Sequence, residues 1–298
     1  MQTYTAEESK KIAMRVSWIS LAINLLLSAF KLTAGLVASS GAMISDAIHS
    51  ASDVFSTIIV MVGVQIASRK ADRQHQYGHE RFESVASVAL ALILLETGLL
   101  IGWKGLRTIL AGSYAALPVP GLLALIAAVV SIVVKEWMYW FTRGAAKKIR
   151  SDALMADAWH HRSDSLSSIG ALVGIGASML GYPIMDSIAS VVICLFIVKA
   201  AVDIFRDAVG KMVDTSCDEP TLKRMRETIL AQEGVLGLNS LHTRLFGARI
   251  YVDVEIAADG DLPLREAHAV AERVHDAIED GFPTVKHCMV HVDPYEEN

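Results

Sequence analysis

The chain has 298 residues, of which 53% are hydrophobic and 20% are charged, and its mean hydropathy is +0.41. This balance is too apolar for an ordinary soluble domain and is typical of a membrane protein with a soluble part. The net charge of −5 gives no indication of nucleic-acid binding, so no nucleic-acid partner is expected.

Apolar runs long enough to cross a bilayer dominate the first two thirds of the chain, and charged residues return every few positions after about residue 205. We therefore predict an α-helical transmembrane domain over residues 1–205 and a cytoplasmic domain over residues 206–298. Six spans are expected, at about 13–37, 41–67, 83–103, 118–142, 153–180 and 183–205.

Basic residues gather on one side of these predicted spans. They precede the first span and lie between the second and third and between the fourth and fifth: Lys10, Lys11, Arg15, Arg69, Lys70, Arg73, Arg81, Arg143, Lys147, Lys148 and Arg150. Only Lys104 and Arg107 lie on the other side. The positive-inside rule therefore predicts cytoplasmic termini. Three cysteines without CxxC spacing also fit a reducing compartment.

The second and fifth spans contain two octets of the same pattern, DAIHSASD and DAWHHRSD. Residues four apart share one face of a helix, so His49 lies near Asp53, and His160 lies near Asp164. If the two helices meet on those faces, two imidazoles and two carboxylates form a tetrahedral set that Zn²⁺ accepts. An ionisable residue inside a bilayer costs about 2.5–3.5 kcal/mol, which favours a function in ion transport.

The same polar residues have a structural alternative, in which the acids bond to nearby serines and hold helices together. Asp46 and Asp157, three residues before each histidine, either orient the imidazoles, line an access path, or act as helix caps and contacts. His161 points about 100° away from its neighbour on the helix and is left out of the site.

Lys135 and Glu136 are expected to snorkel or to form a pair, without a function in transport.

A second cluster lies between the second and third spans, in ADRQHQYGHERFES. Asp72, His75 and His79 have metal-ligand spacing there, although a solvated polar patch is the alternative.

The C-terminal part is predicted to have the order αββαβ, which suits a small two-layer α+β domain of the ferredoxin-like or metallochaperone-like kind. His268 falls on its second helix. His291 and Asp293 lie two apart on the last strand and so share a face.

The paired H-x-x-x-D motifs in the second and fifth of six spans, followed by an αββαβ tail, resemble the cation diffusion facilitator family of divalent-metal transporters. The resemblance implies a secondary transporter and not an enzyme, with no catalytic residues and no catalytic cofactor. Its cargo would be Zn²⁺, with Cd²⁺, Co²⁺ or Fe²⁺ as further candidates, exported in exchange for protons.

Two alternatives remain beside this interpretation: a membrane metal sensor that does not transport, and a transporter chiefly of Fe²⁺ or Mn²⁺. The sequence contains no G-x-x-x-x-G-K-[ST] motif and no H-E-x-x-H motif, which argues against an ATP-driven pump and against a metalloprotease.

The resemblance also assigns roles outside the paired motifs. Asp72, His75 and His79 match the family's loop site. His268, His291 and Asp293 match part of a regulatory metal site in the tail. Asn239 and Glu255 stand where the fullest form of that site has two further histidines. Arg81 and Asp214 fall where the family often has an ion pair between domains. A homodimer formed through the tail, in a bacterial inner membrane, is expected.

Overall fold

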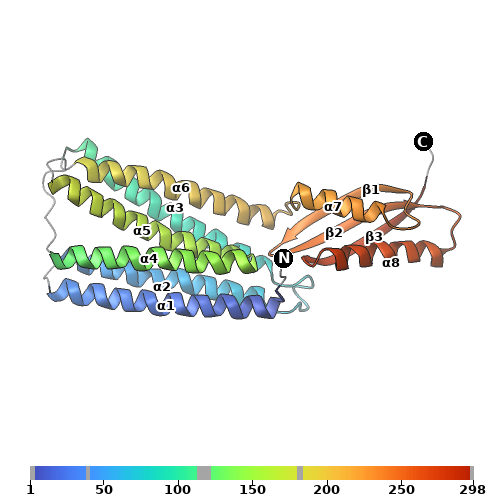
Figure 1. The fold of residues 1–298 in the computed structure, drawn as a ribbon, viewed down its shortest axis with the longest axis horizontal. Coiled ribbons are helices and arrows are strands. Elements are labelled where there is room, and N and C mark those ends of the chain that lie inside the picture. The colour runs from blue at the N-terminus through green and yellow to red at the C-terminus, as the bar shows by residue number, and fades with distance from the viewer. Residues whose placement is uncertain (1–3, 38–40, 113–121, 180–183, 296–298) are drawn as a thin grey trace. The chain divides into compact units, whose positions relative to one another are not determined.

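The computed structural model describes residues 4–37, 41–112, 122–179 and 184–295. The chain divides into two compact units, Tyr4–Ala208 and Val209–Asn298. In the described ranges, the first unit is built from long helices that run side by side (Figure 1). They are α1 (Ala6–Val37), α2 (Gly41–Ala67), α3 (Arg81–Leu110), α4 (Leu122–Ile149), α5 (Asp152–Met179) and α6 (Ile184–Met212).

Packing between these helices brings distant parts of the sequence together. Helix α1 packs against α2 and α4, and α5 packs against α4, α3 and α2. Helix α6 contacts α3, where Ile197 and Leu94 share a small apolar core. The second and fifth helices, which carry the two octets, are therefore neighbours in space.

The first unit has polar groups inside and large apolar side chains outside. Asn24 and Thr57 are buried at 0% exposure, whereas Leu26, Phe55 and Trp103 are 70%, 68% and 66% exposed. Soluble proteins rarely expose apolar surface on this scale, and such a surface fits contact with lipid.

Two helical stretches among the described residues are long and apolar enough to cross a membrane, Glu7–Ala34 and Arg81–Leu110, and Asp53–Ala67 is a shorter apolar stretch. Helix α5 is more polar than these stretches, because Asp157, Arg162 and Asp164 all lie within it.

The second unit has the predicted order αββαβ: α7 (Glu219–Leu230), β1 (Gly237–Phe246), β2 (Arg249–Ala258), α8 (Leu264–Gly281) and β3 (Val285–Pro294). The sheet order is β1-β2-β3, with β1 and β2 antiparallel and β2 and β3 parallel. Gly247, at a φ of 61°, makes the turn between β1 and β2.

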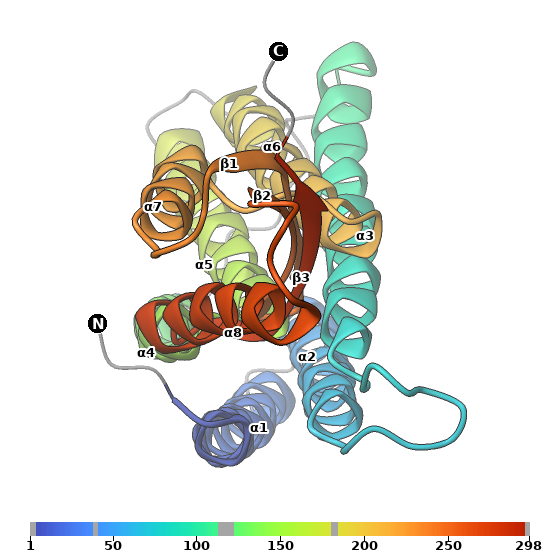
Figure 2. The same ribbon diagram turned by 90° about the vertical axis from the view of Figure 1, so that its right-hand side faces the viewer.

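Both helices of this unit cover the same face of the sheet, and one apolar core lies between the two layers (Figure 2). Val270, Val274 and Ile278 are four apart on α8, so they form a single buried stripe. They pack with Val252 and Ile256 of the central strand, which are fully buried. The predicted two-layer α+β domain is confirmed.

Candidate metal centre

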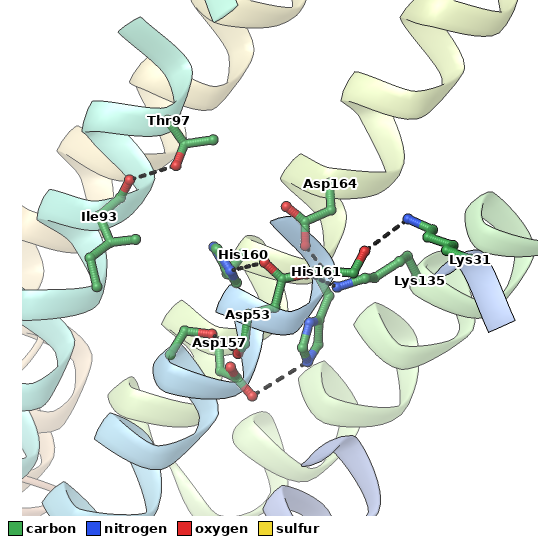
Figure 3. Close-up of polar contacts among 11 residues, drawn as sticks. Lys31, Asp53, Ile93, Thr97, Lys135, Asp157, His160, His161 and Asp164 are labelled. Carbon is green, nitrogen blue, oxygen red and sulfur yellow. Dashed lines mark hydrogen bonds and ion pairs between the residues drawn. The ribbon is translucent and has the colours of Figure 1, made fainter. Parts of the chain in front are cut away.

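Three titratable side chains meet inside the first unit, between α2 and α5 (Figure 3). Asp53 comes from α2, and His160 and Asp164 come from α5; their ligand atoms all lie within 4.8 Å of one another. Their exposed fractions are 3%, 4% and 8%. His160 and Asp164 are one helical turn apart and share a face, as their spacing requires.

The cluster offers nitrogen and oxygen ligands to a metal ion. His160 Nε2 lies 3.4 Å from Asp53 Oδ1. In the part of the chain that the structure describes, Asp164 Oδ1 makes no hydrogen bond. Imidazole nitrogen and carboxylate oxygen are both ligands of Zn²⁺. The side chain of His49, the fourth predicted ligand, lies outside the described residues, so the complete tetrahedral set stays a prediction.

A lysine from a third helix completes the cluster. Lys135 Nζ donates one hydrogen bond to Asp53 Oδ2 at 2.6 Å and another to Asp164 Oδ2 at 2.9 Å. The expected snorkelling of Lys135 is wrong, because its side chain is only 2% exposed and pairs with Asp53 and Asp164 instead. Helix α4 continues to Ile149, so Lys135 lies near its middle and not near its end. A charged residue in the middle of a long apolar helix was the signal in the sequence.

Two other polar contacts surround this cluster. Glu136 was the other residue expected to snorkel or pair. Its Oε1 atom lies 3.7 Å from Arg162 Nη2. A second buried lysine, Lys31 on α1, donates a hydrogen bond to Ser50 Oγ at 2.8 Å.

Asp157 and His161 form a separate buried contact on α5, with 3.5 Å between Asp157 Oδ2 and His161 Nε2. Both side chains are fully buried, and neither makes a hydrogen bond within the described residues. Orientation of His160 was one of three roles predicted for Asp157, but the imidazole beside Asp157 is that of His161, which the predicted site leaves out. The spacing of four residues allows this contact, just as the spacing of three allows one with His160. The side chain of Asp46 lies outside the described residues.

The loop between α2 and α3 brings its three predicted ligands within 4.8 Å of one another. Asp72 Oδ2 lies 3.3 Å from His79 Nε2, and Asp72 Oδ1 lies 3.5 Å from His75 Nδ1. His79 is buried, whereas the other two side chains face solvent. Gly78, at a φ of 101°, provides the turn that returns the chain toward α3.

Backbone amides hold the Asp72 carboxylate in this loop. The N–H groups of His75 and Gln74 donate to Asp72 Oδ1 at 2.7 and 2.8 Å. These hydrogen bonds, that of His75 first, lower the pKa of Asp72 from its usual value. The loop therefore favours a charged carboxylate beside two imidazoles, which suits a divalent cation.

In the second unit, His291 Nε2 lies 3.1 Å from Asp293 Oδ1, and Asn239 Nδ2 donates to Asp293 Oδ2 at 2.9 Å. Glu255 pairs with His291 in the register of β2 and β3. His268 lies on α8, where its Nε2 is 3.4 Å from Glu272 Oε1. Among the described residues His268 does not join His291 and Asp293 in one ligand group, so a metal shared by all three stays a prediction.

The thiol of Cys288, also on β3, is buried. Burial raises the pKa of Cys288 to about 12, so the thiol stays protonated at neutral pH. Metal binding by cysteine requires the thiolate.

Arg81 begins α3 in the first unit, and Asp214 follows α6 in the second with a φ of 63°. Their ion pair stays a prediction.

Comparison with known families covers most of the chain. Residues 17–213 match the family described as cation efflux transmembrane domain, and residues 217–295 match the one described as cation efflux protein, cytoplasmic domain. The chain belongs to the cation efflux family. This membership confirms the predicted family and the predicted fold class, a helical transmembrane domain followed by a cytoplasmic α+β domain.

The chain is similar over most of its length to several other proteins. Metal tolerance protein C1 of Arabidopsis thaliana is 35% identical over 300 residues, a match that covers 97% of this chain and 63% of that protein. The manganese efflux system protein MneP of Bacillus subtilis is 29% identical over 299 residues, covering 98% of this chain and 99% of that protein. Among solved structures, the nickel form of a MamM C-terminal domain variant is similar at 24% identity and a TM-score of 0.26, covering 26% of this chain and all of that one.

Proposed function

We propose that this protein exports divalent metal ions, Zn²⁺ foremost, from the cytoplasm in exchange for protons. The observation that carries the proposal is the buried group of Asp53, His160 and Asp164 between two neighbouring helices. Ionisable residues inside a membrane domain are costly and usually belong to an ion or proton path. Membership of the cation efflux family and the names of its relatives support cation export.

Exchange for protons follows from the chemistry of the ligands. A metal ion binds neutral imidazole and ionised carboxylate, so protons and metal compete for the same atoms. A site that opens in turn to each side of the membrane would release metal where protons are more abundant. The proton gradient would then drive export.

Zinc is favoured over manganese by the imidazole of His160, because nitrogen ligands suit Zn²⁺ and sets made of oxygen alone suit Mn²⁺. Manganese is the second candidate, because a relative over nearly the whole chain is described as a manganese efflux system protein. The two carboxylates of the cluster are compatible with either ion.

The remaining assignments complete this proposal. The membrane is a bacterial inner membrane, and both termini face the cytoplasm because the basic loops lie on that side. Two copies associate through the C-terminal unit. Metal bound at His291 and Asp293 regulates transport from there, and the loop site of Asp72, His75 and His79 binds metal at the cytoplasmic edge.

Metal uptake into sealed proteoliposomes with an imposed pH gradient tests the function. Wild type is compared with Asp53→Ala and His160→Ala, using Zn²⁺, Cd²⁺, Co²⁺, Fe²⁺ and Mn²⁺. We expect saturable zinc uptake that depends on the gradient. Both substitutions should lower its initial rate at least about tenfold, since loss of even an outer partner of a metal ligand costs about 10–100-fold.

Asp203→Ala is the matched control, because Asp203 is an exposed acid on α6 outside the cluster and should leave uptake unchanged. Preferential uptake of Mn²⁺ or Fe²⁺ over Zn²⁺ would overturn the assignment of zinc, but the proposal that the protein is a transporter would stand. Absence of gradient-dependent uptake by folded wild type would favour a sensor.

A further inference from the structure

The ammonium group of Lys135 lies between two carboxylates of the candidate metal centre (Figure 3). Nζ is within 2.9 Å of one oxygen of each acid, at 2.6 Å from Asp53 and 2.9 Å from Asp164. Both are short, charge-assisted hydrogen bonds, which are stronger than neutral ones. The lysine comes from α4, whereas the acids come from α2 and α5.

The formal charges of the group favour either Lys135 or a divalent ion between the two acids, and not both together. Two ionised carboxylates and one ammonium leave a single negative charge in a buried site. If a divalent cation joined the ammonium, the site would carry a net positive charge, which is costly in an apolar interior. If the cation replaced the ammonium, the site would be neutral. The flexible stem of lysine allows its head group to move away.

We propose that Lys135 is a tethered competitor of the transported metal: its ammonium binds Asp53 and Asp164 whenever the metal has left, and it must withdraw before the metal binds. This inference rests on the proposed function, in which Asp53, His160 and Asp164 bind the cargo. Lys135 thereby weakens metal binding and speeds release, because the returning ammonium takes the vacated oxygens. It also neutralises one of the two negative charges while the empty site returns across the membrane.

The size of the effect on metal affinity depends on the fraction of time during which Lys135 is not bound to the two carboxylates. The apparent dissociation constant equals the intrinsic one divided by the fraction of competent sites, so a lysine bound for about nine tenths of the time weakens affinity about tenfold. Removing the ammonium should restore the intrinsic affinity.

The test measures zinc binding and zinc transport by the full-length protein with three substitutions. Lys135→Met removes the charge and keeps an apolar stem, and Lys135→Gln keeps an N–H donor without charge. We expect both to raise zinc affinity about tenfold and to lower KM and the maximal transport rate together, since release becomes slow. Lys135→Arg keeps the positive charge and should keep the weak affinity.

Lys199→Met is the control, because Lys199 is an exposed lysine on α6 outside the cluster. If folded Lys135→Met bound zinc as weakly as wild type or more weakly, Lys135 would not compete with the metal. The lysine would then position the two acids. If Lys135→Met does not fold, Lys135→Gln decides by the same criterion. Failure of the proposed function would give a different result. Metal binding and transport would then be the same in wild type and in Asp53→Ala, or absent from both.

Discussion

The two oxygens of the Asp53 carboxylate face different partners. Oδ1 lies 3.4 Å from His160 Nε2, and Oδ2 accepts a hydrogen bond from Lys135 Nζ at 2.6 Å. One neighbour is a candidate metal ligand and the other is a cation. Substitutions of His160 and Lys135 should therefore change metal affinity in opposite directions, although both residues contact the same acid.

Asp72 provides a pH-dependent prediction at the residue scale. Its lowered pKa means that stabilisation of the loop by the charged carboxylate is complete above the usual pKa of an aspartate. That stabilisation is lost as the pH falls through the lowered value. Hydrogen exchange of the Gln74 and His75 amides, followed by mass spectrometry, should show constant protection from neutral to mildly acidic pH and loss only below that range.

Two substitutions test this assignment. Asp72→Ala should remove the protection at every pH, because both amides lose their acceptor. Asp72→Asn keeps an oxygen acceptor and should retain part of the protection without the loss at low pH. If Asp72→Ala exchanged as slowly as wild type, the carboxylate would not hold the loop.

At the scale of elements, glycines allow α3 to approach its neighbours closely. A Cβ at Gly102 would meet the Cys194 side chain of α6, and a Cβ at Gly98 would lie 2.8 Å from Ile197 Cγ2. Small residues at helix contacts are the usual means of close packing within a membrane. These two positions set the distance between α3 and α6.

Gly102→Ala should therefore destabilise the first unit, although alanine is the better helix former. Overpacking costs about 1–3 kcal/mol, whereas the gain in helix propensity is at most about 1 kcal/mol. Gly144→Ala is the same change on α4 with nothing within 4 Å of the added atom, so it should be neutral or stabilising. Thermal unfolding of the full chain in detergent measures both. Equal unfolding temperatures for the two variants would mean that α6 can move away to accommodate the added methyl group.

At the scale of the whole molecule, the two units have separate apolar cores. The second unit buries apolar residues such as Met225 and Val252, whereas the first buries polar groups beside its apolar core and exposes large apolar side chains. A core of this size predicts that the second unit folds without the first.

Residues 209–298 expressed alone should unfold cooperatively, and Zn²⁺ should stabilise them if His291 and Asp293 bind it. Free zinc at 100 times its Kd adds about 2.7 kcal/mol to the free energy of unfolding. Thermal unfolding and sedimentation with and without zinc measure stability and self-association. His291→Ala should remove the zinc effect, and His287→Ala, an exposed histidine on the same strand, should keep it. A unit whose stability and association ignored zinc would contradict regulation through this site.

The sequence by itself determined the order of elements and the identity of the polar clusters. Hydrophobic run length predicted the long helices, period-two and period-3.6 patterns predicted αββαβ, and spacing of four placed His160 and Asp164 on one face. These are local properties, because a side chain's direction depends only on its position along one element. The loop cluster of Asp72, His75 and His79 was predictable because its members lie close together in the sequence.

Only the tertiary structure decided which helices supply the site. Lys135 and Asp53 are 82 residues apart in sequence, and no periodicity relates them, so their contact depends on how α2 and α4 each pack against α5. Sequence spacing also could not decide whether Asp157 faces His160 or His161, since both lie within one turn of it. Packing between helices placed Lys135 against the two acids, because a buried charged group is tolerated only where an opposite charge meets it.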